Sequence, residues 1–200
     1  MRAIGIDPGT REVGYGVVDS LDGKLCYRDS GTIACPGEKD LARRLAAIHR
    51  ALQVVMREWA PEAAAVEKVF FGRDSQAAIK IGEGRGVALL SAAEAGVPVT
   101  GYEPTLVKRA LCGNGRAGKS QVQKTVRALL SLEKLPPSDH ESDALALAIC
   151  HLYRDRAPCP QQGPKTLPAA VLKALGGRLP ARRRKKARRM RLGRSLRKEL

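Results

Sequence analysis

The residues of this chain best suited to chemistry are acids that adjoin apolar segments. Asp7 directly follows the apolar run at residues 3–6 and precedes the turn residues Pro8-Gly9. Glu67 interrupts the run at residues 63–69, AAAVEKV, which is short enough to be a strand buried on both faces. Because a buried carboxylate without a partner costs several kcal/mol, Glu67 needs a cation or a proton nearby.

A histidine and a third acid complete a set of candidate metal ligands. His140 and Asp143 are three residues apart at the start of a predicted helix, so they lie on one face of it. A strand end, an inner strand and a helix start could bring all four residues to one cleft, where oxygen-rich ligands suit Mg²⁺ or Mn²⁺ rather than zinc. Two such ions would polarise a phosphate, generate hydroxide from water and stabilise the leaving oxygen, which is the chemistry of phosphodiester hydrolysis.

Each of these residues also has a structural explanation when it is taken alone. Asp7 could be an Asx-type turn residue, and Glu67 could lie at the end or the edge of its strand. His140 and Asp143 could interact only with the helix dipole. The combination of all four favours the metal site.

The segment GNGRAGKS, residues 113–120, matches the phosphate-binding loop pattern G-x-x-x-x-G-K-[ST]. A nucleotide-binding loop of this type follows a buried strand, whereas this one follows residues 105–112, TLVKRALC, whose apolar residues have helical spacing. We therefore predict that it does not bind ATP. Its glycines, the start of the next helix, and the charges of Arg116 and Lys119 suit phosphates of DNA instead.

The elements that must position these residues form a meander followed by alternating helices and strands. Apolar patterns and turn residues predict strands at 3–6, 13–19, 24–33, 63–69 and 97–102, and helices at 41–59, 75–95, 105–111, 121–132 and from 138 onward. Ser138 and Glu141 have the spacing of a capping box, which starts the last helix. The pattern predicts an α/β fold in which helices flank a mixed five-stranded sheet.

Most of the positive charge lies at the end of the chain. Of the net charge of +16, residues 178–200 hold twelve Lys and Arg against one acid, so that +16 less +11 leaves +5 for the rest. Such a run suits a polyanion, although it could serve only for solubility. We predict a nuclease domain at 1–156, a linker with prolines and glycines at 157–177, and a basic, disordered tail at 178–200.

The cysteines and the hydropathy exclude several other classes of protein. Five cysteines are an odd number and form no C-x-x-C pair, so neither a metal cluster nor a disulfide framework is expected. No apolar run reaches the ~18 residues of a membrane span, and no signal peptide precedes the first strand. These features predict a soluble cytoplasmic protein.

Four segments of the chain together resemble the RuvC family of Holliday-junction resolvases, which have the RNase H-like fold. They are IGIDPGTREVGYGVVDS, AVEKVFFGRDSQAAIKIGEGRGVAL, GKSQVQ and HESDALALAIC, and the resemblance runs from about residue 1 to 155. It implies that Asp7, Glu67, His140 and Asp143 are the catalytic residues, holding two Mg²⁺ for which Mn²⁺ can substitute. His140 stands at a position where members of the family carry either aspartate or histidine. The histidine removes one negative charge and must be neutral to bind a metal.

The resemblance also implies the substrate and the partners. The reaction would be symmetric nicking of two like-polarity strands of a four-way DNA junction, in recombination and repair, leaving 5′-phosphate and 3′-hydroxyl ends. A homodimer would carry it out, with the RuvA and RuvB branch-migration proteins as partners, and the glycines and alanines of the 75–95 helix suit the dimer contact.

Further residues are expected to contact the DNA. Lys108 and Lys119 match family lysines that serve DNA binding, and Lys119 is also expected to act in catalysis. Phe70 matches a position that stacks on a base near the crossover, although it could be a core residue. Arg73 and Lys80 are basic and close to Phe70 in sequence, which suits backbone contacts.

Three other functions remain open at this point. Asp7-Pro8-Gly9-Thr10 fits the opening of actin-type ATPases and sugar kinases, although about 155 foldable residues are too few for their two domains. The chain could be a junction- or RNA-binding protein with vestigial acids. It could also be a RuvC-type nuclease of ribosomal RNA precursors, although those are usually shorter and lack the motif that follows Glu67.

The basic tail generates a first prediction. Truncation after Arg156 should lower the affinity for duplex and for junction DNA alike and flatten the dependence of binding on salt, because the tail adds charge but no shape recognition. Gel-shift titrations of both DNAs at several salt concentrations measure this. A loss confined to junctions would mean that the tail reads shape.

Overall fold

A five-stranded mixed sheet forms the centre of the protein. The computed structural model describes residues 1–68 and 75–156. Its strands are β1 (Arg2–Asp7), β2 (Glu12–Leu21), β3 (Lys24–Ala34), β4 (Ala63–Glu67) and β5 (Val99–Tyr102), in the order β3-β2-β1-β4-β5. β1, β2 and β3 are antiparallel neighbours, whereas β4 is parallel to β1 and β5 is parallel to β4. The predicted meander and mixed sheet are confirmed.

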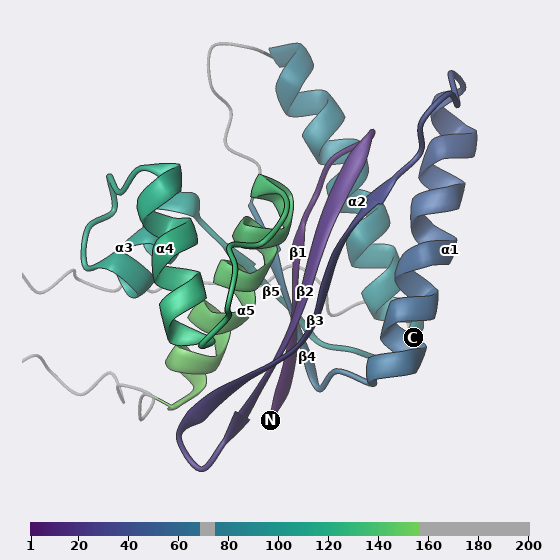
Figure 1. Cartoon of the computed structure of the whole chain (residues 1–200). Coiled ribbons are helices and arrows are strands. Elements are labelled where there is room, and N and C mark those ends of the chain that lie inside the picture. Colours follow the sequence, from purple (N-terminus) through teal and green to yellow (C-terminus); the bar gives the residue numbers. More distant parts are fainter. Residues whose placement is uncertain (69–74, 157–200) are drawn as a thin grey trace, which may run out of the picture. The chain divides into compact units, whose positions relative to one another are not determined.

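Helices cover both faces of this sheet. They are α1 (Leu41–Trp59), α2 (Ser75–Glu94), α3 (Pro104–Cys112), α4 (Lys119–Leu129) and α5 (Asp139–Arg156). Figure 1 shows α1 and α2 on one side of the sheet and α3, α4 and α5 on the other. All five predicted helices are present, and α4 differs most from its predicted range because it begins and ends earlier in the chain. No helix within these two ranges is long and apolar enough to cross a membrane.

The period of two along β1 divides the interior into two cores. Ile4 and Ile6 belong to the core under α1 and α2, and both are fully buried. Ala3 belongs to the core under α5, on the other face. β4 alternates in the same way, with Ala65 on the α5 face. A side chain at the next odd position of either strand therefore points toward α5.

Glycines let α5 lie directly on the backbone of the sheet. A Cβ atom at Gly5 would overlap the carbonyl oxygen of Ala144, and one at Gly14 would overlap the carbonyl oxygen of His140. One at Gly16 would come within 2.8 Å of the Leu145 side chain. Because a helix with larger residues beneath it would have to rise, these three glycines set the height of α5 above β1 and β2.

Hydroxyl groups hold the first turn of α5 against β3. The Glu141 N–H donates to Ser138 Oγ at 3.1 Å, as the predicted capping box requires. The Glu141 side chain does not complete the box, because its Oε2 accepts from Ser30 Oγ at 3.2 Å. Thr32 Oγ1 lies 2.7 Å from Ser138 Oγ. The second half of the predicted box is thus replaced by bonds across to the sheet.

Some of the predictions made from sequence lie outside the described residues. These are the positions of Phe70 and Arg73, the linker at 157–177 and the basic tail at 178–200. They stay predictions.

The close contact of α5 generates a stability prediction. Gly5→Ala should lower the free energy of unfolding by about 1–3 kcal/mol, because the new methyl group meets backbone atoms of Ala144 and Ala148 that cannot rotate away. Urea denaturation measures the change. Glu58→Ala is the control: Glu58 is exposed in the last turn of α1, so its replacement should change the free energy of unfolding by no more than about 0.5 kcal/mol. A Gly5→Ala protein as stable as wild type would contradict the described contact.

Candidate active site

Asp7 and Glu67 meet at one end of the sheet. β1 and β4 are parallel, and Ile6 pairs with Val66, so the next residue of each strand is one of these two acids. Both side chains point to the face that α5 covers, since they continue the alternation of Gly5 and Ala65. The carboxyl ends of parallel strands are where ligands bind in open α/β sheets.

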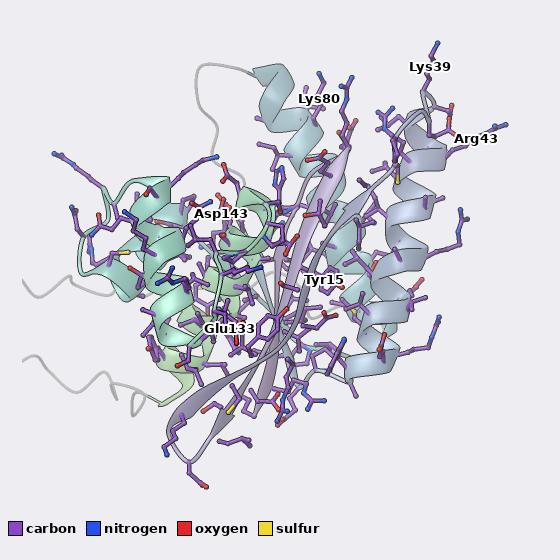
Figure 2. The ribbon with its side chains drawn as sticks, in the orientation of Figure 1. Tyr15, Lys39, Arg43, Lys80, Glu133 and Asp143 are labelled. Atoms are coloured by element: carbon purple, nitrogen blue, oxygen red, sulfur yellow. The ribbon has the colours of Figure 1, made fainter. Side chains whose placement is uncertain are left out.

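The first turns of α5 bring the other two predicted residues to the same place. His140 Nδ1 lies 2.7 Å from Asp7 Oδ2. Because a carboxylate only accepts, Nδ1 carries the hydrogen and His140 Nε2 is left facing Glu12 Oε2 at 3.5 Å. Figure 2 shows Asp143 at the start of α5, the helix that packs on β1. The structure thus brings Asp7, Glu67, His140 and Asp143 together.

Burial raises the pKa values of all three acids, and neighbouring negative charges raise those of Glu67 and Asp143 further. Burial raises the pKa of Glu67 to about 7, and the negative charges of Asp7 and Asp143 add to the rise, while Lys108 opposes it. Burial also raises the pKa of Asp7, although the hydrogen bond from His140 lowers it in part. The pKa of Asp143 is raised by burial and then by Asp7. These carboxylates therefore share one electrostatic environment that favours a cation or protons.

The donor set fits a hard divalent cation, although its side chains are not closed around one. Carboxylate oxygens are the ligands that Mg²⁺ and Mn²⁺ prefer, and mutual repulsion is what a cation between them would relieve. Across residues 1–68 and 75–156, however, no three His, Cys, Asp or Glu side chains converge closely enough to hold a metal ion. Binding therefore requires rotation of these side chains toward one another.

Two lysines predicted from the sequence share a pocket with the acids. A cavity of about 200 Å³ is lined by Glu67, Asp143, Lys108 and Lys119, among other residues. Lys108 comes from α3 and Lys119 from the first residue of α4. Basic side chains beside a cluster of acids suit a phosphate group, whose charge they offset.

Lys119 is held by an acid that was not predicted. Its Nζ lies 3.2 Å from Asp139 Oδ2, and Gln123 Nε2 donates to Asp139 Oδ1 at 2.7 Å. This pairing raises the pKa of Lys119. Asp139 lies inside the segment SDHESD, so its position next to the predicted ligand His140 could have identified it as a residue of the site.

A second, larger cavity lies on the His140 side. It measures about 900 Å³ and contains the predicted DNA contact Lys80 as well as Glu12, which was not predicted. Arg116 lines neither of these two cavities; it lies on the exposed loop before α4, where its N–H donates to Asn114 Oδ1 at 2.9 Å. Arg85 was also missed, and its Nε donates to the carbonyl oxygen of Glu67 at 3.1 Å. No sequence signal marks that contact, because it depends on how α2 packs beside β4.

The glycine loop does not have the setting of a nucleotide-binding loop. It connects α3 to α4, with Gly113 ending α3 in the left-handed region and Gly118 preceding the first turn of α4. The prediction that no strand precedes it is confirmed.

Comparison with known proteins relates this site to one family. The model of the family "Crossover junction endodeoxyribonuclease RuvC" matches residues 3–151. The RuvC crossover junction endodeoxyribonuclease of Syntrophomonas wolfei is 45% identical over 156 residues, which cover 78% of this chain and 91% of that protein. That of Chloroflexus aggregans is 45% identical over 153 residues, covering 76% and 93%.

A solved structure agrees with these sequence matches. The chain superposes on Thermus thermophilus RuvC in complex with a Holliday junction substrate with a TM-score of 0.73 and 38% identity, over 78% of this chain and 95% of that one. The predicted RNase H-like fold is therefore confirmed. Proteins of this family are metal-dependent nucleases, as the cluster of acids requires. The chain belongs to the RuvC family of crossover junction endodeoxyribonucleases.

Proposed function

We propose that this chain resolves four-way DNA junctions by cutting two strands of like polarity at symmetric positions, leaving 5′-phosphate and 3′-hydroxyl ends. The observation that carries the proposal is the meeting of three acids with raised pKa values and His140 at the end of β1 and β4. Membership of the RuvC family supports the choice of substrate.

The metal ions would be held by Asp7, Glu67, Asp143 and His140. When bound, Mg²⁺ supplies a Lewis acid for the scissile phosphate and a more acidic water, and two ions per site suit the number of donors. Mn²⁺ prefers similar oxygen ligands and should substitute.

The protein's own groups orient the substrate and move protons. Asp7 fixes the ring of His140 through Nδ1, so that Nε2 is the nitrogen on the side of the larger cavity. A neutral imidazole there accepts a proton from water or donates a lone pair to a cation. Lys108 and Lys119 offset the charge of the phosphate from the smaller pocket, and Lys119 must leave Asp139 to do so.

We expect a homodimer, because a four-way junction offers two equivalent strands to cut. Three apolar side chains of α2 are exposed, namely Ile79, Ile81 and Leu90. Ile79 and Ile81 line the larger cavity, so Leu90 is the one that suits a contact with a second copy. RuvA and RuvB are the expected partners, and the cytoplasm is the expected place of action because the substrate is DNA. Phe70 and Arg73 remain proposed DNA contacts.

A cleavage assay tests the proposed function. Purified protein is incubated with a labelled four-way junction, and with a duplex of matched sequence, in Mg²⁺ and in Ca²⁺. We expect symmetric nicks on the junction only, in Mg²⁺ only. Asp7→Asn should reduce the rate at least about a hundredfold, because it removes one charge of the cluster.

Asp22→Asn is the matched control, since Asp22 is exposed in the turn between β2 and β3, and asparagine tolerates its positive φ of 47°. It should cut like the wild type. Tight junction binding without cutting by the wild type would instead support a binding protein with vestigial acids.

The raised pKa of Glu67 generates a prediction about stability without metal. The pKa in the folded protein is about 7 against an ordinary value of 4.5, so ionised Glu67 destabilises the fold. Its penalty is absent below pH 4.5, grows as the pH rises through 7, and is complete at pH 8. In EDTA at pH 8, Glu67→Gln should therefore be more stable than wild type by about 1–3 kcal/mol, and this gain should vanish near pH 4.

Urea denaturation at several pH values measures the difference. Added Mg²⁺ should stabilise the wild type at pH 8 and stabilise Glu67→Gln less. Glu133→Gln is the control, because Glu133 is exposed and lies away from Asp143 (Figure 2). An equal gain in the free energy of unfolding for both variants, or a gain that does not depend on pH, would contradict the conclusion that ionised Glu67 destabilises the fold.

A further inference from the structure

The larger cavity beside His140 carries an excess of positive charge. Its charged side chains besides His140 are four basic groups and two acids, namely Arg11, Lys39, Arg44, Lys80, Glu12 and Glu83. They come from the turn between β1 and β2 and the first residue of β2, from the loop before α1 and its first turn, and from the first half of α2. Figure 2 shows Lys39 and Lys80 extending from the same end of the two helices.

Arg44 has a structural role that fixes one wall of this cavity. Its Nε donates to the carbonyl oxygen of Thr10 at 3.1 Å, and its Nη1 donates to those of Glu38 and Lys39 at 3.0 Å each. The loop before α1 is therefore tied to the turn after β1. On the opposite wall, a Cβ at Gly84 of α2 would overlap the carbonyl oxygen of Gly9. Contacts to backbone carbonyl oxygens therefore hold both walls in place.

Three basic groups are left without a counter-charge. Within the described part of the chain, the side chains of Arg11, Lys39 and Lys80 form no ion pair or hydrogen bond. Of the two acids, Glu12 faces His140 at 3.5 Å, and Glu83 pairs with none of the three. By contrast, Lys119 in the smaller pocket is paired with Asp139. Three unpaired cations around one cavity suit an anionic ligand.

The positive surface continues away from the active site. A neighbouring hollow of about 430 Å³ follows the loop between β3 and α1, and it shares three basic residues and one acid with the larger cavity, namely Arg11, Lys39, Arg44 and Glu12. It adds one acid, Glu38, whose Oε1 accepts from the Asp40 N–H at 2.9 Å. The shape is therefore a groove that leads outward from His140, which fits an extended ligand.

The catalytic residues lie between this groove and the smaller pocket. Glu67 and Asp143 line the smaller pocket, together with Lys108 and Lys119, whereas His140 lines the groove. A strand whose scissile phosphate rests on the acids has basic side chains available on both sides.

We propose that Arg11 and Lys39 bind backbone phosphates of the cut strand, on the His140 side of the scissile phosphate. Lys80 was expected from the sequence, whereas Arg11 and Lys39 are additions. The proposal rests on the proposed function, since it takes the acids as the place of cutting. Contacts to phosphates position the strand and contribute affinity without reading its sequence.

Binding measurements with charge-matched variants test the groove. The double variant Arg11→Ala/Lys39→Ala is compared with Lys24→Ala/Arg57→Ala, which removes the same charge from exposed positions that line none of these cavities. Dissociation constants for a four-way junction are measured without divalent metal at several salt concentrations. The groove variant should bind about tenfold more weakly near 0.1 M salt, and the slope of log K against log salt should fall by about 2. The control should lose less than half of that slope.

Neutral phosphates locate the contact on the DNA. Two sets of junctions are synthesised in which neutral methylphosphonates replace two or three phosphates of the cut strand. One set carries them on one side of the cut, and the second set carries them on the opposite side. The wild type and the control should bind the junction more weakly when phosphates on one side are neutralised, whereas the groove variant should show no further loss on that same side. If the groove variant loses affinity as the wild type does on both sides, or if both double variants behave alike, Arg11 and Lys39 do not bind the cut strand.

The failure of the groove assignment and the failure of the proposed function give different results. A wild type that cuts junctions while the groove variant binds normally overturns the groove and leaves the proposed function intact. A wild type that binds but never cuts overturns the proposed function. In that case the groove assignment fails with it, because no cut strand exists, and the methylphosphonate pattern then describes only a binding surface.

Discussion

The contact between the backbone of α5 and the backbone of β1 and β2 is the constraint on which the site depends. At Gly5, Gly14 and Gly16 no sheet side chain separates the helix from the backbone of the sheet. The helix therefore lies low enough for His140 Nδ1 to reach Asp7 at 2.7 Å. The same contact buries Leu145, Leu147 and Ile149, each worth about 1.5–3 kcal/mol. Packing energy thus holds the first turn of α5 where the chemistry needs it.

This packing energy also offsets an electrostatic cost. Burial raises the pKa values of Asp7, Glu67 and Asp143, and the negative charge of Asp7 adds to the rise at the other two, so the folded protein without cations is less stable than its core alone would make it. The hydrogen bond from His140 reduces the cost at Asp7 but not at Glu67. A histidine at position 140, in place of a fourth acid, keeps the total negative charge of the cluster lower. The protein then needs less counter-charge to complete the site than a cluster of four acids does.

The helices and strands and the candidate ligands could be predicted from the sequence. The elements show a periodic spacing of apolar residues, and the acids stand out because they interrupt or adjoin apolar runs. The spacing of apolar residues predicted α1, and the acid within an apolar run marked Glu67. The sequence was not sufficient for contacts that depend on how elements pack. Arg85 reaches the carbonyl of Glu67, and Glu141 turns to Ser30, only because of the register of α2 and α5 against the sheet. The glycines of β1 and β2 were visible as letters, but nothing local indicated which of them faces a helix.

The order of the site residues along the chain has a consequence for synthesis. Asp7 leaves the ribosome 133 residues before His140, which belongs to α5 together with Asp143. Because α5 completes both the core and the cluster, a nascent chain that lacks it has neither a closed fold nor a full set of ligands. A product that ends before α5 therefore lacks two of the four proposed ligands, and we expect it to have no nuclease activity.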